Sequence, residues 1–382
     1  MAAALARSAR AHCMRAGACA HTVRARHHQN HGAQQLQQHG GASATRHAHA
    51  AAGAAATPTS APGLSASPGR GLLPVVYHPA YSAPLLRAGH RFPMQVFGTI
   101  HDRLLHHHRL IGPGQVHVPT RLPDDDVLAL VHMREYVSAF SEGRLDDVRA
   151  RRIGFGAALS EPVLIERTKA EVAGTLLTAR LALRHGLACN TAGGTHHAFP
   201  SFGSGYCILN DLAVTTELLI AEGAVRRVLV LDLDVHQGDG TAAIFAGRKD
   251  VFTLSVHCES NFPARKQAST LDIGLPDGTG DDAYLSKIAD VLPRVLSEFK
   301  PDLVLYDAGV DVHTADVLGR LCVSDEGLKR RELLVLDTVL AAGVPLAGYV
   351  GGGYDDDLNV LADRHVALHA AAVRMWGEYE LS

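Results

Sequence analysis

The stretch RVLVLDLDVHQGDG (residues 227–240) decides the fold. It begins as an almost unbroken aliphatic run and then turns polar at Asp232, Asp234, His236 and Asp239. A strand without polar alternation is typical of a parallel sheet that is covered by helices on both faces. Such sheets bind ligands outside the carboxyl ends of their strands. The stretch therefore predicts a central buried strand and, directly after it, a functional edge.

The rest of the chain from residue 71 repeats this pattern. Five further apolar segments are expected to be strands: LLPVVYH (72–78), ACNTAGG (188–194), VFTLSVH (251–257), DLVLYDAGVD (302–311) and VPLAGYVGGGY (344–354). Helical patterns lie between them at 166–185, 211–222, 281–299 and 327–342. Alternating strands and helices predict an α/β fold, a single three-layer α/β/α domain with a mainly parallel central sheet that spans residues 71–382.

The first 70 residues have a different composition. They contain seven Arg, no Lys and no acidic residue, and the first acid of the chain is Asp102. With few large apolar residues, this segment is expected to be disordered. An Arg-rich, acid-free start such as MAAALARSARAHCMRAGA (1–18) resembles an organelle transit peptide. We therefore expect a chloroplast or mitochondrial location, with the nucleus or cytoplasm as the alternative.

Composition narrows the possible function of the body. The chain after residue 70 contains 29 basic residues and all 39 acidic ones, which gives it a net charge of about −10. A body this acidic is a poor candidate for binding nucleic acid through phosphate contacts. No run is long and apolar enough to span a bilayer. The six Cys in 382 residues are too few and too scattered for a disulfide framework.

Polar residues gather at the ends of four expected strands. Strand side chains repeat every two residues, so Asp232, Asp234 and His236 are expected to point the same way. Other strands end in Asp307 and Asp311, in the pair His196–His197, and in three glycines followed by Tyr354. Clustered carboxylates and imidazoles at one edge would repel one another or lose hydration unless a cation satisfied them. The pattern therefore predicts a metal-dependent hydrolytic site.

The residue types suggest a role for each group. Asp234, His236 and Asp311 could supply the three protein ligands of a catalytic Zn²⁺, although Fe²⁺ also suits two carboxylates and one imidazole. His196 and His197 are suited to acid–base catalysis near neutral pH. Asp232 and Asp239 are available as their carboxylate partners. Tyr354, on a glycine-rich turn, could donate a hydrogen bond to a developing oxyanion.

These motifs also carry a family resemblance. GGTHHAF (193–199), SGYCILND (204–211), DLDVHQGDGT (232–241), DAGVD (307–311) and GGGY (351–354), in this order, resemble the zinc-dependent histone deacetylases, which have the arginase/deacetylase fold. The resemblance extends from about Val75 to Trp376. DAGVD followed by GRL (319–321), together with HQGDG, is most similar to the class IV branch and its plant and bacterial relatives.

The resemblance implies further roles. His197 would be the general base, and Gly205, Tyr206 and Phe262 would form the walls of an acyl-lysine channel. Arg91, in HRFPM (90–94), is similar to an arginine near the product-exit cavity. A structural K⁺ would be bound by backbone carbonyls of Asp232, Asp234, His236 and Ser255.

The expected function is removal of acetyl or longer acyl groups from the Nε atom of lysine in proteins, histones among them. The alternatives are a deacetylase of small acylated amines such as acetylpolyamines, a ureohydrolase and an inactive scaffold. The segment IGFGAALSEPV (153–163) lacks the Asp with which many relatives hold the substrate backbone. The sequence does not indicate the oligomeric state.

Overall fold

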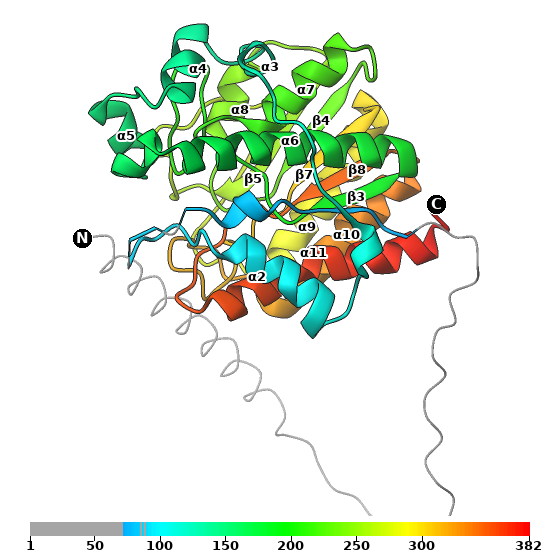
Figure 1. The fold of residues 1–382 in the computed structure, drawn as a ribbon. Helices are drawn as coiled ribbons and strands as arrows, with labels where there is room; N and C mark the ends of the chain where they lie inside the picture. The colour runs from blue at the N-terminus through cyan, green and yellow to red at the C-terminus, as the bar shows by residue number, and fades with distance from the viewer. Residues whose placement is uncertain (1–71, 85, 88) are drawn as a thin grey trace, which may run out of the picture.

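The structure is a computed structural model, and it describes residues 72–84, 86–87 and 89–382. Figure 1 shows a single body built around one twisted sheet. The transit-peptide prediction concerns residues 1–70, which lie outside the described residues.

The sheet has eight strands, and every pair of neighbours runs parallel. Their order across the sheet is β2-β1-β3-β8-β7-β4-β5-β6. The strands are β1 (Val75–Val76), β2 (Val116–His117), β3 (Leu187–Asn190), β4 (Val228–Asp232), β5 (Val251–Cys258), β6 (Leu271–Leu275), β7 (Leu303–Asp307) and β8 (Leu346–Tyr349).

Helices cover both faces of this sheet, which confirms the α/β fold class. In Figure 1, α6 and α7 lie over one face, while α9, α10, α11 and α2 lie over the other. The helices are α2 (Val96–Asp102), α3 (Asp125–Leu128), α4 (Arg134–Ser141), α5 (Asp147–Ile153), α6 (Pro162–His185), α7 (Asp211–Ala221), α8 (Asp239–Ile244), α9 (Asp281–Phe299), α10 (Asp325–Ala341) and α11 (Leu358–Glu378).

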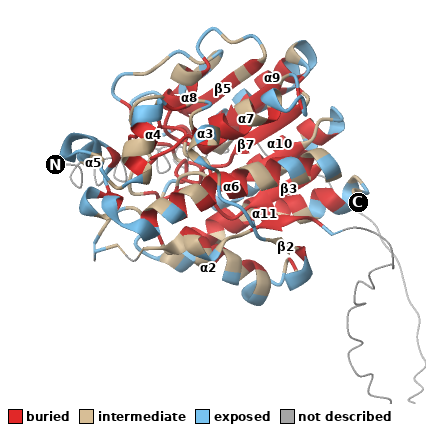
Figure 2. Cartoon of the chain, turned by 45° about the horizontal axis from the view of Figure 1, so that its top comes forward, coloured by how far each residue is buried: buried red, intermediate tan, exposed pale blue. Residues whose placement is uncertain are grey.

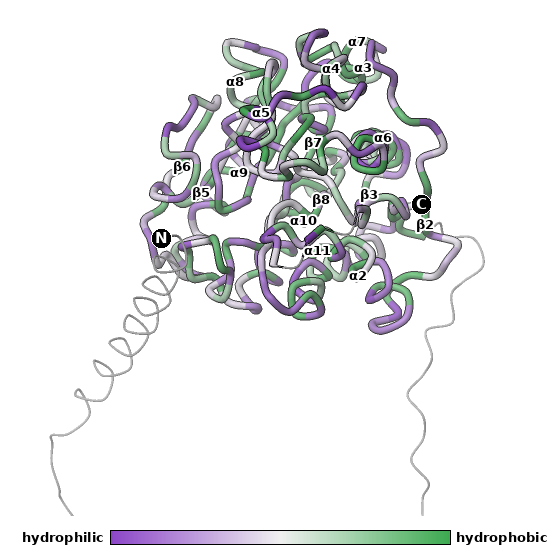
Figure 3. Tube along the Cα trace, turned by 60° about the vertical axis from the view of Figure 1, so that its left-hand side comes forward, coloured by the Kyte–Doolittle hydropathy of each residue, from purple (hydrophilic) through white to green (hydrophobic). Residues whose placement is uncertain are grey.

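The aliphatic run of β4 explains the layered core. Val228 and Val230 pack into the core beneath α6 and α7, whereas Leu229 and Leu231 pack into the larger core on the opposite face. Because successive side chains of a strand point to opposite faces, an uninterrupted apolar run is what two buried faces require. Figure 2 shows the central strands buried, and Figure 3 shows the hydrophobic colour along strands such as β7 and β8, whereas the edge strands β2 and β6 are partly exposed.

The strand order brings the predicted polar segments together. β3, β8, β7 and β4 are consecutive neighbours in the sheet and run in the same direction. The loops that leave their carboxyl ends therefore meet at one edge. These loops contain the His pair, the glycine turn before Tyr354, Asp311, and Asp234 with His236.

Two details of the sequence-based assignment are wrong. Five of the six predicted strands are longer than the observed ones, and the exception is β5; for example, β4 ends at Asp232 and β7 at Asp307. Asp234, His236 and Asp311 therefore lie in loops, and a two-residue strand period is not the reason for their convergence. In addition, β2, β6 and the long helix α11 had not been assigned. No helix among the described residues has the length and hydropathy needed to cross a membrane.

A buried histidine connects the fold to the functional edge. The backbone N–H of Asn210, at the start of α7, donates to Nε2 of His132 (2.9 Å), so Nδ1 carries the proton and donates to the carbonyl oxygen of Phe199 (3.0 Å). Burial lowers the pKa of His132 to about 4. The native state therefore requires the neutral form of this side chain.

We expect acid to destabilise the protein through His132. The unfolded chain takes up this proton below about pH 6.5, so the stabilising contribution is complete above that pH and declines, by up to about 3 kcal/mol, as the pH falls toward 4. His132→Gln can keep both hydrogen bonds but cannot titrate. Its free energy of unfolding, from urea titrations at several pH values, should fall less steeply with acidification than that of the wild type. Equal slopes would contradict this role.

Candidate active site

Three predicted metal ligands converge in the structure. Asp234, His236 and Asp311 are buried, and one ligand atom from each lies within 4.8 Å of the others. Nδ1 of His236 is 3.0 Å from Oδ1 of Asp234 and 3.1 Å from Oδ2 of Asp311. Ligands about 2.0–2.1 Å from a tetrahedral Zn²⁺ lie roughly 3.3 Å apart, so the trio has the spacing that such an ion requires.

The surroundings of this trio also fit a cation. Burial and the neighbouring Asp234 raise the pKa of Asp311 to about 6, because two carboxylates lie close together away from water. A Cβ atom on Gly352 would lie 2.5 Å from both Oδ2 of Asp234 and Oδ2 of Asp311. Glycine at this position thus lets the backbone approach both carboxylates, and its N–H donates to Asp234 Oδ2 (2.9 Å).

The two adjacent histidines have separate carboxylate partners. Nδ1 of His196 lies 2.9 Å from Oδ2 of Asp232, and Nδ1 of His197 lies 2.7 Å from Oδ1 of Asp239. Burial lowers the pKa of His197 to about 4, and the neighbouring His196 adds to this effect. Burial also opposes a charge on His196, but nearby carboxylates, led by Asp232, outweigh it and raise the pKa of His196 well above its usual value. The pair therefore combines one basic and one neutral imidazole.

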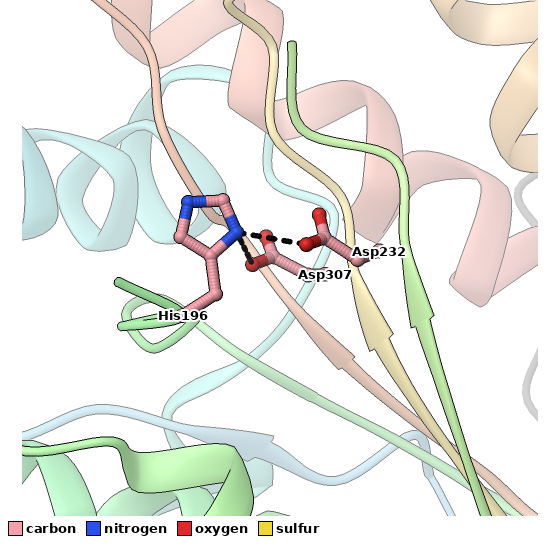
Figure 4. Close-up of side chains that lie close together, drawn as sticks. All are labelled: His196, Asp232 and Asp307. Carbon is pink, nitrogen blue, oxygen red and sulfur yellow. Dashed lines mark hydrogen bonds and ion pairs between the residues drawn. The ribbon is translucent and has the colours of Figure 1, made fainter. Parts of the chain in front are cut away.

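Asp307 is a buried carboxylate without a predicted role. It is the last residue of β7 and lies beside Asp232, its register partner at the end of β4. Figure 4 shows both carboxyl groups directed at the same nitrogen of His196, and Oδ2 of Asp307 lies 3.6 Å from that Nδ1. Among the described residues, neither oxygen of Asp307 has a hydrogen-bond partner. Burial and the nearby Asp232 raise its pKa well above the usual range, so this carboxyl is easily protonated.

Side chains at the start of α7 hold the loop that carries the histidines. Oδ1 of Asp211 accepts hydrogen bonds from the N–H (2.8 Å) and hydroxyl (2.7 Å) of Thr195. Nδ2 of Asn210 donates to the carbonyl oxygen of Ala198 (3.2 Å). These contacts explain SGYCILND, a motif whose last two residues had no assigned role.

Tyr354 lies at the same edge, and Asp316 fixes its backbone. Oδ2 of Asp316 accepts the N–H of Tyr354 (2.7 Å), while Oδ1 accepts the N–H groups of Leu318 and Gly319, both at 2.8 Å. Burial raises the pKa of Tyr354 well above 10, so its hydroxyl stays protonated and can donate a hydrogen bond. Asp316 was missed because a single Asp in a loop carries no pattern in the sequence.

The three predicted channel residues line one cavity. This cavity, about 420 Å³ in volume, is shared by Gly205, Tyr206 and Phe262 with His197, His236 and Tyr354. The ring of Phe262 meets the ring of His197 edge to face, with centroids 4.9 Å apart. A Cβ atom on Gly205 would lie 2.7 Å from Cδ2 of His197, so only glycine allows this loop to pack so closely on the imidazole.

Arg91 does not lie where the resemblance implied. It is exposed and lines a separate surface cavity with Asp355 and Asp356. The arginine behind the site is Arg167 of α6, which lines a small inner cavity of about 50 Å³ with Glu171. Nη1 of Arg167 is 2.6 Å from Oε2 of Glu171, and both side chains are buried. HRFPM had suggested Arg91 from local motif alone, which does not show where a side chain points.

Comparison with known proteins identifies the family. Residues 90–370 match the family described as the histone deacetylase domain. The chain belongs to the histone deacetylase family. It is accordingly a hydrolase of the deacetylase type.

Relatives of known sequence or structure show the same likeness. An uncharacterized protein from Picosynechococcus is 54% identical over 78% of this chain and 98% of its own length. Histone deacetylase 2 of Arabidopsis thaliana is 29% identical over 62% of this chain and 63% of that protein, and the acetoin utilization protein AcuC of Staphylococcus aureus is 32% identical over 66% and 69%. The crystal structure of the HDA15 HD domain is similar in fold, with a TM-score of 0.65, 21% identity, and coverage of 78% of this chain and 88% of that one.

The close approach of Gly352 to two carboxylates can be tested. Gly352→Ala would place its methyl group against both Asp234 and Asp311, so we expect the purified variant to hold much less metal than the wild type. Metal content by mass spectrometry is the measurement. Gly377→Ala, near the end of α11 with open space around the added atom, is the matched control. Full metal occupancy in Gly352→Ala would show that this contact does not shape the site.

Proposed function

We propose that this protein is a zinc-dependent deacylase of Nε-acyl-lysine in proteins. One observation carries the proposal. Two adjacent histidines, each with its own carboxylate, lie beside a buried Asp–His–Asp trio, and one histidine of each set, His197 and His236, lines a cavity with aromatic walls. This combination of a metal site and an acid–base pair is what hydrolysis of an unactivated amide needs.

His196 and His197 have different proposed catalytic roles. His197 is neutral at physiological pH and its Nδ1 is held by Asp239, so the opposite nitrogen is available to take a proton from the attacking water. His196 retains its proton because of the carboxylates around it, and its positive charge stabilises the negative charge that develops in the transition state. The departing lysine amine then receives the proton held by His197.

Asp234, His236 and Asp311 would hold the zinc ion. When bound, zinc lowers the pKa of a coordinated water molecule and polarises a carbonyl group. The Tyr354 hydroxyl would donate a hydrogen bond to the carbonyl oxygen of the scissile amide. Fe²⁺ suits the same ligands, so metal-free protein reloaded with either ion would show which one supports turnover. We also propose a structural K⁺ at the backbone carbonyls of Asp232, Asp234, His236 and Ser255.

A small acylated amine is the second candidate substrate. Segment 153–163 contributes Ile153 and Gly154 to the lining of the cavity and contains no Asp that could bind a peptide backbone. An unbranched amine could enter the same channel between Tyr206 and Phe262. Assays with acyl-lysine peptides beside acetylated amines distinguish the two.

Tyr354→Phe tests the proposed mechanism. If the hydroxyl acts on the carbonyl oxygen mainly in the transition state, kcat should fall about 100- to 1000-fold while KM and bound zinc change little. Asp311→Ala should instead lose the metal together with activity, because it removes a ligand. Steady-state kinetics on an acetyl-lysine peptide and zinc content are the measurements. A kcat within about threefold of the wild type, with full zinc, would remove Tyr354 from the catalytic residues.

We further propose that residues 1–70 direct the protein to an organelle. Since this segment has no acidic residue and few large apolar ones, it should add nothing to the catalytic domain, and protein 71–382 should retain folding and activity. A fluorescent fusion of residues 1–70 should enter a chloroplast or mitochondrion. Diffuse or nuclear fluorescence would contradict the proposal.

A further inference from the structure

The mouth of the cavity carries only one sign of charge. Apart from histidines, the charged side chains among its described lining residues are Arg151, Arg152 and Arg320, and no Asp or Glu is among them. We call these three residues the arginine rim. This charge is the opposite of that of the body, in which acidic residues exceed basic ones by about ten. The rim is therefore a local feature rather than a reflection of composition.

Two of these arginines are held in place by their surroundings. The guanidinium carbon of Arg152 lies 3.8 Å above the ring of Phe202. Nη1 of Arg320 donates to the carbonyl oxygen (3.2 Å) and the hydroxyl (3.0 Å) of Ser260. Fixed side chains lose less conformational freedom when they bind a partner, so they are better suited to recognition than mobile ones.

The positive charge of the rim is only weakly compensated within the protein. Among the described residues, no carboxylate forms an ion pair with Arg151 or Arg152. Arg320 has only the half-exposed Asp277, whose Oδ2 is 3.8 Å from Nη1. Asp355, which follows Tyr354, belongs to a neighbouring cavity and is bound by Arg364 at 2.8 Å. The rim can therefore attract an external anion.

The position of the rim indicates which part of a substrate it meets. Arg151 and Arg152 come from the last turn of α5, whereas Arg320 comes from the loop after β7. Both segments lie at the mouth, and the two arginines of α5 are exposed, whereas His197 and His236 are buried deeper in the cavity. A lysine side chain that reaches the histidines would thus leave its backbone and neighbouring residues beside the arginines.

We propose that the arginine rim selects acyl-lysines with Asp or Glu residues next to them. This inference rests on the proposed lysine deacylase function and adds the substrate class. Carboxylates beside the acyl-lysine would pair with the rim, whereas the Lys- and Arg-rich sequence of a basic tail, or a polyamine cation, would be repelled.

A matched set of peptides tests the proposal on the full-length protein. Each peptide carries one acetyl-lysine, flanked on both sides by acidic, by neutral or by basic residues; acetylspermidine is the fourth substrate. At low salt we expect kcat/KM to be about tenfold higher for the acidic than for the neutral peptide, and lowest for the basic one. The differences should shrink as salt rises from about 0.01 M to 1 M, because the Debye length falls from roughly 30 Å to 3 Å.

Variants identify the residues responsible. Arg151→Gln and Arg320→Gln should each lower the acidic-to-neutral ratio of kcat/KM about three- to fivefold, the effect of one exposed charge pair. Arg151→Glu should move the preference toward the basic peptide. Arg149→Gln is the matched control, because Arg149 lies on the same helix but pairs with Asp146 (2.7 Å) and does not line the mouth.

The outcomes separate this inference from the function on which it rests. If the metal-loaded protein cleaves none of the peptides, the lysine deacylase function fails. If it cleaves all of them at similar rates, or cleaves the basic peptide or acetylspermidine fastest, the deacylase activity stands and the acidic-substrate inference is overturned. A preference for the acidic peptide that persists unchanged in both Gln variants also overturns it.

Discussion

The structure depends on keeping several carboxylates buried at one edge of a sheet. Asp232, Asp234, Asp307, Asp311 and Asp316 are all at most 4% exposed and come from the ends of two neighbouring strands and the loops that follow. Charges so far from water are stable only if donors or cations surround them. Among the described residues, each carboxylate except Asp307 accepts a hydrogen bond from a backbone N–H group, whereas Asp307 has an ion pair with Nδ1 of His196 at 3.6 Å. The proposed zinc ion would compensate the charges of Asp234 and Asp311.

Helix α10, which covers one face of the sheet, fixes the backbone of the loop that follows β7. Arg331 of α10 is fully buried and donates to the carbonyl oxygens of Gly309 (2.6 Å) and Ala308 (3.0 Å), in the loop that leads from β7 to Asp311. Glu332 balances its charge and accepts the hydroxyl of Tyr306 in β7 (2.7 Å). Helix α10, which covers the sheet, therefore also sets the position of a candidate ligand, Asp311. Such support makes a site precise without contact with the substrate.

The candidate catalytic and metal-binding residues could be predicted from the sequence better than the residues that hold them in place. Apolar runs that end in Asp or His predicted the parallel sheet and the convergence at its carboxyl edge, since both follow from local pattern and the geometry of parallel strands. Tertiary contacts between loops and helices determine the roles of Asp316 and Arg331 and bring Asp307 close to His196. The spacing of residues along the chain does not encode these contacts. Arg91 was misplaced for the same reason. The edge strands β2 and β6 were not predicted, because β2 has only two residues and β6 alternates in polarity, as the partly exposed pattern of Leu271–Leu275 shows.

The contrast between the two histidines follows from where their partners lie. His196 is within 4 Å of carboxylate oxygens from Asp232, Asp234 and Asp307, whereas His197 has one carboxylate and two imidazole neighbours, His196 and His236. Adjacent residues with identical side chains thus acquire opposite protonation preferences, because one faces the ends of β4 and β7 and the other faces the start of α8. The positive His196 also keeps its neighbour neutral, since a second buried positive charge beside it would be unfavourable. The proposed acid–base function is accordingly a property of the pair. A change in the carboxylates around either histidine alters the proton affinity of both imidazole rings.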